Sequence, residues 1–233
     1  MELDDTVRIV GIFKPNLTSR LLLEQVSNYL TKIRPNLSDE ISILDLGTGS
    51  GFVAFELKEK FSTFRIYASD FSPESIDLAN ENASKKDIKI EFRCGDLFDP
   101  WGDKTFDLII NDVSGISSEL ISLGGWFEGV PCETGKDGTL LTEKLLKQAK
   151  NFLQPNGVII TPLLSLSSTS KIEEIMSNSF RYIEMLQEEI VPLPKIDSQM
   201  ANLIQSLNSQ KLIETRNIGG LSYFTVKFFL LGN

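Results

Sequence analysis

A glycine-rich turn, and a carboxylate that follows it at the spacing of one helix, are the residues of this chain best suited to chemistry. Gly47, Gly49 and Gly51 follow one apolar run, and Asp70 closes the next. This pattern predicts a strand, a turn, a helix and a second strand. In a parallel sheet such glycines let the backbone approach a ligand, and such a carboxylate accepts hydrogen bonds from ribose hydroxyls. The sequence therefore predicts a site for an adenosine-containing cofactor.

The spacing of the glycines narrows the choice of cofactor. A dinucleotide-binding turn has the spacing G-x-G-x-x-G, but here the spacing is G-x-G-x-G, and Phe52 stands where the third glycine would fall. A dinucleotide oxidoreductase is therefore disfavoured. No Lys follows Gly51, as a phosphate-binding Walker loop would require, so an NTPase is disfavoured as well. The alternative is an ordinary strand-loop-helix whose glycines only satisfy a tight turn.

Composition excludes several classes of protein. The chain has no His, which rules out a Ser-His-Asp triad and a histidine-ligated metal. Two cysteines are too few for a cysteine zinc site, so we expect no metal. The net charge of −9 disfavours broad binding to a nucleic acid backbone. The acidic N-terminus and the lack of a long apolar stretch predict a cytoplasmic protein with no membrane partner.

Around the turn the sequence alternates between strand and helix patterns, which predicts an α/β fold. We expect residues 1–233 to form one domain, with a strand and helix extension over 1–37 and a substrate loop over 113–138. The predicted strands are 41–46, 64–69, 88–93, 106–111, 157–162 and 223–230. The predicted helices are 17–30, 73–84, 140–153, 168–177 and 198–207.

The glycine turn resembles motif I of the class I S-adenosylmethionine-dependent methyltransferases. That resemblance implies a Rossmann-like fold with helices on both faces of a mostly parallel sheet and an antiparallel C-terminal strand. It places Asp45 near the methionine moiety of S-adenosylmethionine and Asp70 on its ribose. Asp96 contacts the adenine amino group in this reading, although a turn-forming Asp is the alternative. The cofactor residues predicted in this way are Asp45, Gly47, Thr48, Gly49, Gly51, Asp70, Phe71, Asp96, Leu97 and Asn111.

Several further segments resemble one branch of that superfamily, the release-factor glutamine N-methyltransferases and their relatives. The matching segments are 12–23, 96–98, 106–111 and 135–138, within a region from Val10 to Pro162. In the branch, the first of these segments borders the active site, which makes Pro15 a substrate-binding candidate.

The chain departs from the branch where the acceptor would bind. The branch carries Asn-Pro-Pro-Tyr after the fourth strand, and here Asn111 is followed by Asp112, Val113 and Ser114. The rigid clamp for a planar nitrogen is therefore missing, and glutamine is not predicted as the acceptor. Asn111 and Asp112 are the catalytic candidates, with Asp112 either a base or a cap of the next turn. Ser114 is a weaker substrate-binding candidate.

The long glycine-containing segment after Val113 has two interpretations. Trp126 and Phe127 lie between glycines and can form a lid over the acceptor, which makes Trp126 a substrate-binding candidate. The alternative is a short helix around 117–123. The predicted function is methyl transfer from S-adenosylmethionine to nitrogen on a protein side chain or small molecule. The alternatives are an RNA or DNA base methyltransferase and a non-catalytic module that binds the cofactor.

Overall fold

The computed structural model describes residues 16–33, 41–124, 133–194 and 196–233. The helices are α1 (Leu17–Ile33), α2 (Phe52–Lys60), α3 (Pro73–Lys86), α4 (Ser118–Gly124), α5 (Leu140–Ala149), α6 (Thr169–Ser179) and α7 (Ser198–Ser209). The strands are β1 (Ser42–Leu46), β2 (Arg65–Asp70), β3 (Glu91–Cys94), β4 (Phe106–Asn111), β5 (Leu153–Leu164), β6 (Tyr182–Pro192), β7 (Thr215–Ile218) and β8 (Leu221–Gly232). Within these ranges, no helix combines the length and apolar character needed to cross a bilayer.

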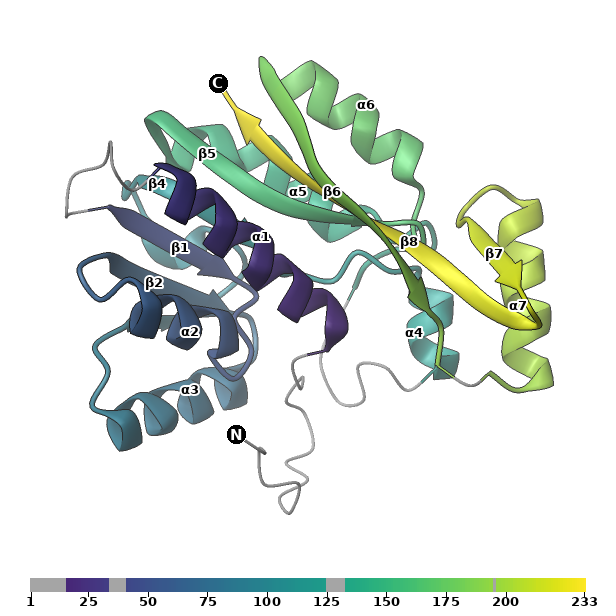
Figure 1. The fold of residues 1–233 in the computed structure, drawn as a ribbon, viewed down its shortest axis with the longest axis horizontal. Helices are drawn as coiled ribbons and strands as arrows, with labels where there is room; N and C mark the ends of the chain where they lie inside the picture. The colour runs from purple at the N-terminus through teal and green to yellow at the C-terminus, as the bar shows by residue number, and fades with distance from the viewer. Residues whose placement is uncertain (1–15, 34–40, 125–132, 195) are drawn as a thin grey trace.

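One sheet organises the molecule (Figure 1). Its strand order is β3-β2-β1-β4-β5-β8-β6, with β7 paired to β8 outside this path. Strands β1 to β5 pair in parallel, whereas β8 runs antiparallel to both β5 and β6. Helices connect β1 to β2, β2 to β3 and β4 to β5, as crossover connections require, whereas a short 3-10 helix over Asp99–Trp101 lies between β3 and β4. The predicted Rossmann-like fold with an antiparallel C-terminal strand is therefore confirmed.

Two apolar layers cover the sheet, because alternate residues of a strand point to opposite faces. In β1, Ile43 packs in the layer formed with α1, α2 and α7, whereas Leu44 and Leu46 pack in the layer formed with α5 and α6. Figure 1 shows α1 in front of the strands and α5 behind them. Helices on both faces leave the strand ends as the place where polar residues can gather.

Local sequence accounts for the start of α3. Ser72 is the N-cap, its hydroxyl accepts a hydrogen bond from the amide of Ser75 (3.1 Å), and Pro73 occupies the first turn. Because this cap fixes where the helix begins, it also fixes the chain that leaves the end of β2. The capping arrangement expected from the sequence is confirmed.

The largest boundary differences from the sequence prediction lie between α5 and β5. The helix predicted over 140–153 ends at Ala149, and β5 begins at Leu153 and runs through Pro155. The strand accommodates this proline because its register with β4 shifts, so Phe106 pairs with Leu153 but Leu108 pairs with Val158. Strands β6 and β7 add to the predicted set. The short helix that was the alternative for 117–123 is present as α4.

Candidate cofactor and acceptor site

The turn after β1 is bonded to the end of β2. The amides of Gly47 and Thr48 both donate to the carbonyl of Ser69, at 2.9 and 3.1 Å. The amide of Gly49 donates to Oδ2 of Asp70 at 2.8 Å. These bonds place the glycine turn and the carboxylate side by side, as the sequence predicts for the ends of adjacent parallel strands.

Asp70 both anchors the turn and keeps acceptor capacity. Its Oδ1 accepts the amide of Ser72 at 2.9 Å, so each oxygen has one backbone donor. A carboxylate offers about four acceptor positions, which leaves about two for hydroxyl donors from a ligand. Burial raises the pKa of Asp70, although the hydrogen bonds from Ser72 and Gly49 oppose the shift.

Gly47 sits where no other residue fits without distortion. Its φ is +79°, and a Cβ there would lie 3.0 Å from the nitrogen of Val113 and 3.1 Å from the carbonyl atoms of Asp112. The turn can therefore press against the end of β4 only because this position has no side chain. Gly51 closes the turn, with its amide donating to the carbonyl of Thr48 at 2.9 Å.

Asp45 is a buried carboxyl group, and only one of its two oxygens has a partner at hydrogen-bond distance. The side chain lies on β1 with no solvent exposure, and the hydroxyl of Thr48 donates to Oδ2 at 2.6 Å. Oδ1 is buried and has no partner among the described residues. Burial raises the pKa of Asp45 to about 7 and the nearby Asp70 raises it further, whereas the hydroxyl of Thr48 and the backbone amide of Ala54 lower it. Such an atom is a ready acceptor for a cationic donor.

Asp112 lies directly after β4 and adds a third carboxyl group. Its pKa is raised well above the ordinary value by burial and by the charges of Asp45 and Asp70, although the hydroxyl of Ser19 donates to it. The amide of Asp112 donates to the carbonyl of Leu46, which ties it to the end of β1. Three mutually repelling carboxyl groups make this edge of the sheet a site for positive charge.

Asp96 lies beyond the end of β3 and is paired with Lys144 of α5. Cys94 is opposite Asp70 in the sheet, so Asp96 follows at the same edge. Leu97 is buried in the apolar layer of α5 and α6. Phe71, by contrast, is 58% exposed, which leaves a ring face open at the end of β2.

Asn111 is turned into the protein by two bonds. Its Nδ2 donates to Oγ1 of Thr161 at 2.8 Å, and its Oδ1 accepts the amide of Val113 at 3.1 Å. The bond from Val113 caps the turn after β4, a role that the sequence analysis had considered for Asp112 rather than for Asn111. Among the described residues, no backbone amide caps the turn through the carboxylate of Asp112, which faces Ser19 instead.

The other acceptor-side candidates are placed only in part. The hydroxyl oxygen of Ser114 is buried and has no hydrogen-bond partner in the described part of the chain. Pro15 and Trp126 lie outside the described residues. The roles assigned to these residues from the sequence stay predictions.

Sequence reasoning did not single out three residues that shape the site. Ser19 on α1 reaches Asp112, Lys144 on α5 reaches Asp96, and Thr161 on β5 holds Asn111. Ser19 lies in the segment whose family resemblance already placed it near the active site, so a signal existed. Lys144 and Thr161 depend on helix orientation and on the β4–β5 register, which no local pattern specifies.

The strand order, glycine turn and carboxylates define an α/β protein of the kind that binds a nucleoside-containing cofactor at its strand ends. A family model described as a methyltransferase domain matches residues 37–216. Because the match spans most of the chain, the protein belongs to the methyltransferase domain family. This confirms the superfamily assignment made from motif I.

Two curated relatives and one solved structure illustrate the relationship. The release factor glutamine methyltransferase of Streptococcus pneumoniae is 31% identical over 129 residues, covering 53% of this chain and 46% of the relative. The ribosomal protein uL3 glutamine methyltransferase of Francisella tularensis is 27% identical over 166 residues, covering 69% and 51%. The precorrin-6y C5,15-methyltransferase of Geobacter metallireducens has a TM-score of 0.56 at 16% identity, covering 100% and 98%.

The chain spans about half the length of these two curated relatives. The matches support the relationship to the release-factor branch that the sequence segments indicated. At 16% identity, the likeness to the precorrin enzyme shows the fold alone.

Proposed function

We propose that this protein is an S-adenosylmethionine-dependent methyltransferase that acts on a nitrogen atom of a protein side chain or small molecule. The observation that carries the proposal is the buried, unpartnered Oδ1 of Asp45, which lies among the raised-pKa carboxyl groups of Asp70 and Asp112. S-Adenosylmethionine supplies a methyl group on a positively charged sulfur and also carries an ammonium group. The positive charges of its sulfonium and ammonium groups are complementary to the three carboxyl groups at this edge of the sheet.

A metal ion fits the same carboxyl groups less well. Across the described ranges, no three or more Asp, Glu, Cys or His side chains are arranged to hold one. The carboxyl groups of Asp45, Asp70 and Asp112 are instead distributed over three strand ends. An extended ligand with separate polar groups can satisfy all three.

The residues divide the work of cofactor binding. Asp45 would accept the ammonium group, and Asp70 would use its remaining acceptor positions for the ribose hydroxyls. Phe71 offers an exposed ring for packing against adenine. Asp96 would accept the adenine amino group through an acceptor position that Lys144 does not use.

Acceptor chemistry falls to the end of β4. Methyl transfer is an in-line displacement, so most of the catalysis is placement of the acceptor lone pair. Asp112 would take the proton that the acceptor nitrogen loses, and its pKa is shifted upward, the direction that makes a carboxylate a stronger base. Two relatives are named for glutamine methylation of proteins, which supports a protein acceptor. We also propose a cytoplasmic location, where release factors and ribosomal proteins are found.

Transfer of a labelled methyl group into an extract fractionated as protein, nucleic acid and small molecules tests the proposal. Asp70→Ala should abolish labelling, since it removes a ribose acceptor and an anchor of the turn, whereas the exposed Asp77→Asn on α3 should not. Label in the protein or small-molecule fraction supports the proposal. Label in nucleic acid would replace it with a base methyltransferase. Tight cofactor binding with no labelled fraction, although the extract holds the natural acceptors, would favour the non-catalytic module.

A further inference from the structure

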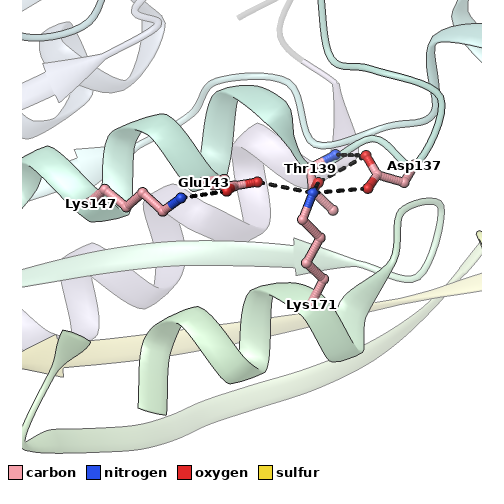
Figure 2. A network of polar contacts seen from close by, with 5 residues as sticks. All are labelled: Asp137, Thr139, Glu143, Lys147 and Lys171. Carbon is pink, nitrogen blue, oxygen red and sulfur yellow. Dashed lines mark hydrogen bonds and ion pairs between the residues drawn. The ribbon is translucent and has the colours of Figure 1, made fainter. Parts of the chain in front are cut away.

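The N-terminal half of α5 contacts the site at two places and also joins a polar network beside it. Oγ1 of Thr142 lies 3.5 Å from where a Cβ on Gly115 would be, which places it beside the chain that leaves β4. Lys144 pairs with Asp96 at the end of β3. Between them, Glu143 belongs to the polar network drawn in Figure 2.

Lys171, in the first turn of α6, is the centre of that network (Figure 2). Its ammonium group donates to Oγ1 of Thr139 at 3.0 Å and to Oδ2 of Asp137 at 3.1 Å. It also pairs with Glu143 at 3.0 Å. Lys147 pairs with the other oxygen of Glu143 at 2.6 Å and has no further bond in the figure. One cation thus joins the end of the β4–α5 connection to two helices.

Asp137 is fixed by more than its ion pair. Its Oδ1 accepts the amide and the hydroxyl of Thr139, at 3.2 and 2.9 Å, and its carbonyl accepts the amide of Ser168 at 2.8 Å. Burial raises the pKa of Asp137, but the hydrogen bonds from Thr139 and Lys171 outweigh it, and the pKa lies below its ordinary value. The carboxylate is therefore charged at neutral pH.

Gly138, next to Asp137, packs directly against the backbone near the start of the β4–α5 connection. Its φ is +72°, and a Cβ there would lie 2.6 Å from the nitrogen of Ser117 and 2.7 Å from the carbonyl carbon of Ile116. These two residues follow Asp112 by only four and five positions. Because the backbones touch without a side chain between them, a shift of Asp137 displaces the chain next to the proposed base.

We propose that Lys171 is a positioning residue that fixes the described ends of the β4–α5 connection, and with them Asp112, at the place where the acceptor would bind. The inference rests on the proposed function. Lys171 is 43% exposed, and exposed ion pairs contribute little to the free energy of unfolding. A cation that joins three groups nevertheless restricts where they lie, and small displacements of reacting groups are costly to rate. Its removal should therefore impair use of the acceptor more than folding.

The test compares Lys171→Met and Lys171→Arg with Lys147→Met, which removes an exposed partner of the same Glu143. The first readout is hydrogen exchange at the amides of Thr139 and Ser168, which the network orders directly. The second is kcat/KM for methylation of the purified acceptor fraction, and the third is the Kd for S-adenosylmethionine by calorimetry. The exchange measurement needs no acceptor, so it stays informative if the proposed function fails.

We expect Lys171→Met to speed exchange at both amides and to lower kcat/KM by roughly tenfold to a hundredfold, with Kd for the cofactor unchanged. Lys171→Arg should restore much of the loss, because a guanidinium group can also pair with both carboxylates. Wild-type exchange in Lys171→Met, or an equal loss of kcat/KM in Lys147→Met, would overturn the role of Lys171. If exchange is faster in Lys171→Met but the wild-type protein methylates nothing, then Lys171 orders the network and the proposed function is wrong.

Discussion

The two halves of the site differ in how fully the chain defines them. At the ends of β1 and β2, the turn and Asp70 are held by backbone bonds, and Asp45 presents a buried unpartnered oxygen. At the end of β4, Asn111 bonds inward and Asp112 faces Ser19. The proposed cofactor half is built from local sequence, whereas the proposed acceptor half depends on contacts between distant elements. Specificity for the acceptor is therefore the part of such a fold that can change while the cofactor half is kept.

Gly47→Ala should have the largest effect on cofactor binding and stability, since it disrupts the close contact between the glycine turn and the end of β4. A Cβ here meets the backbone of Asp112 and Val113 at 3.0–3.1 Å, in addition to about 1–3 kcal/mol of strain from φ +79°. We expect cofactor binding to be lost in calorimetry and the midpoint of urea unfolding to fall. The matched control is Gly219→Ala, which has φ +59° and open space around the Cβ position. Equal destabilisation by both variants would show that the close approach has no energetic consequence.

Asp112→Asn should have the next largest effect and should separate the halves. Loss of a general base lowers kcat by about a hundredfold or more. The Kd for S-adenosylmethionine should change far less, since the carboxyl groups of Asp45 and Asp70 are both kept. The rate of the wild-type protein should rise with pH as Asp112 loses its proton, and this rise should disappear in the variant. Asp103→Asn, on an exposed turn before β4, is the control. An unchanged kcat in Asp112→Asn would remove the base from the proposed mechanism.

Much of the sheet could be predicted because apolar periodicity and capping residues are local signals. The turn from Gly47 to Gly51, the helix start at Ser72 and the carboxylate Asp70 all belong to this class. The end of α5 could not be predicted in this way. Pro155 ordinarily stops a helix, and only the register shift against β4 lets it lie within a strand.

The site shows the same division. Asp70 was identified from its spacing and Asp45 from the resemblance to motif I, and the structure brings both to the glycine turn. Thr161 and Lys171 were not, because each acts through a partner that is far along the chain, at Asn111 and at Asp137. A sequence shows which residues follow a strand, but it does not show which side chain of another element will reach them.

Asp45→Asn should have the smallest of the three effects on function, and the pH dependence of that effect tests the proposed role of Asp45 in cofactor binding. Because the folded-state pKa of about 7 lies above the ordinary 3.8, the folded protein keeps this proton after the unfolded chain has lost it. The stabilising contribution is therefore complete below about pH 4 and is lost as pH rises through 7. Without ligand, Asp45→Asn should be more stable than the wild type at pH 8, by roughly 2–4 kcal/mol, and equally stable near pH 4. Asp70 and Asp112 also have raised pKa values, so their contributions to stability likewise fall as the pH rises.

In Asp45→Asn, the Kd for S-adenosylmethionine should rise about tenfold at pH 8, which corresponds to the loss of one charge-assisted hydrogen bond. Urea unfolding and calorimetry at both pH values measure the two effects. A variant that is destabilised at pH 8, or that binds the cofactor as tightly as the wild type, would show that the buried oxygen of Asp45 has its partner within the protein.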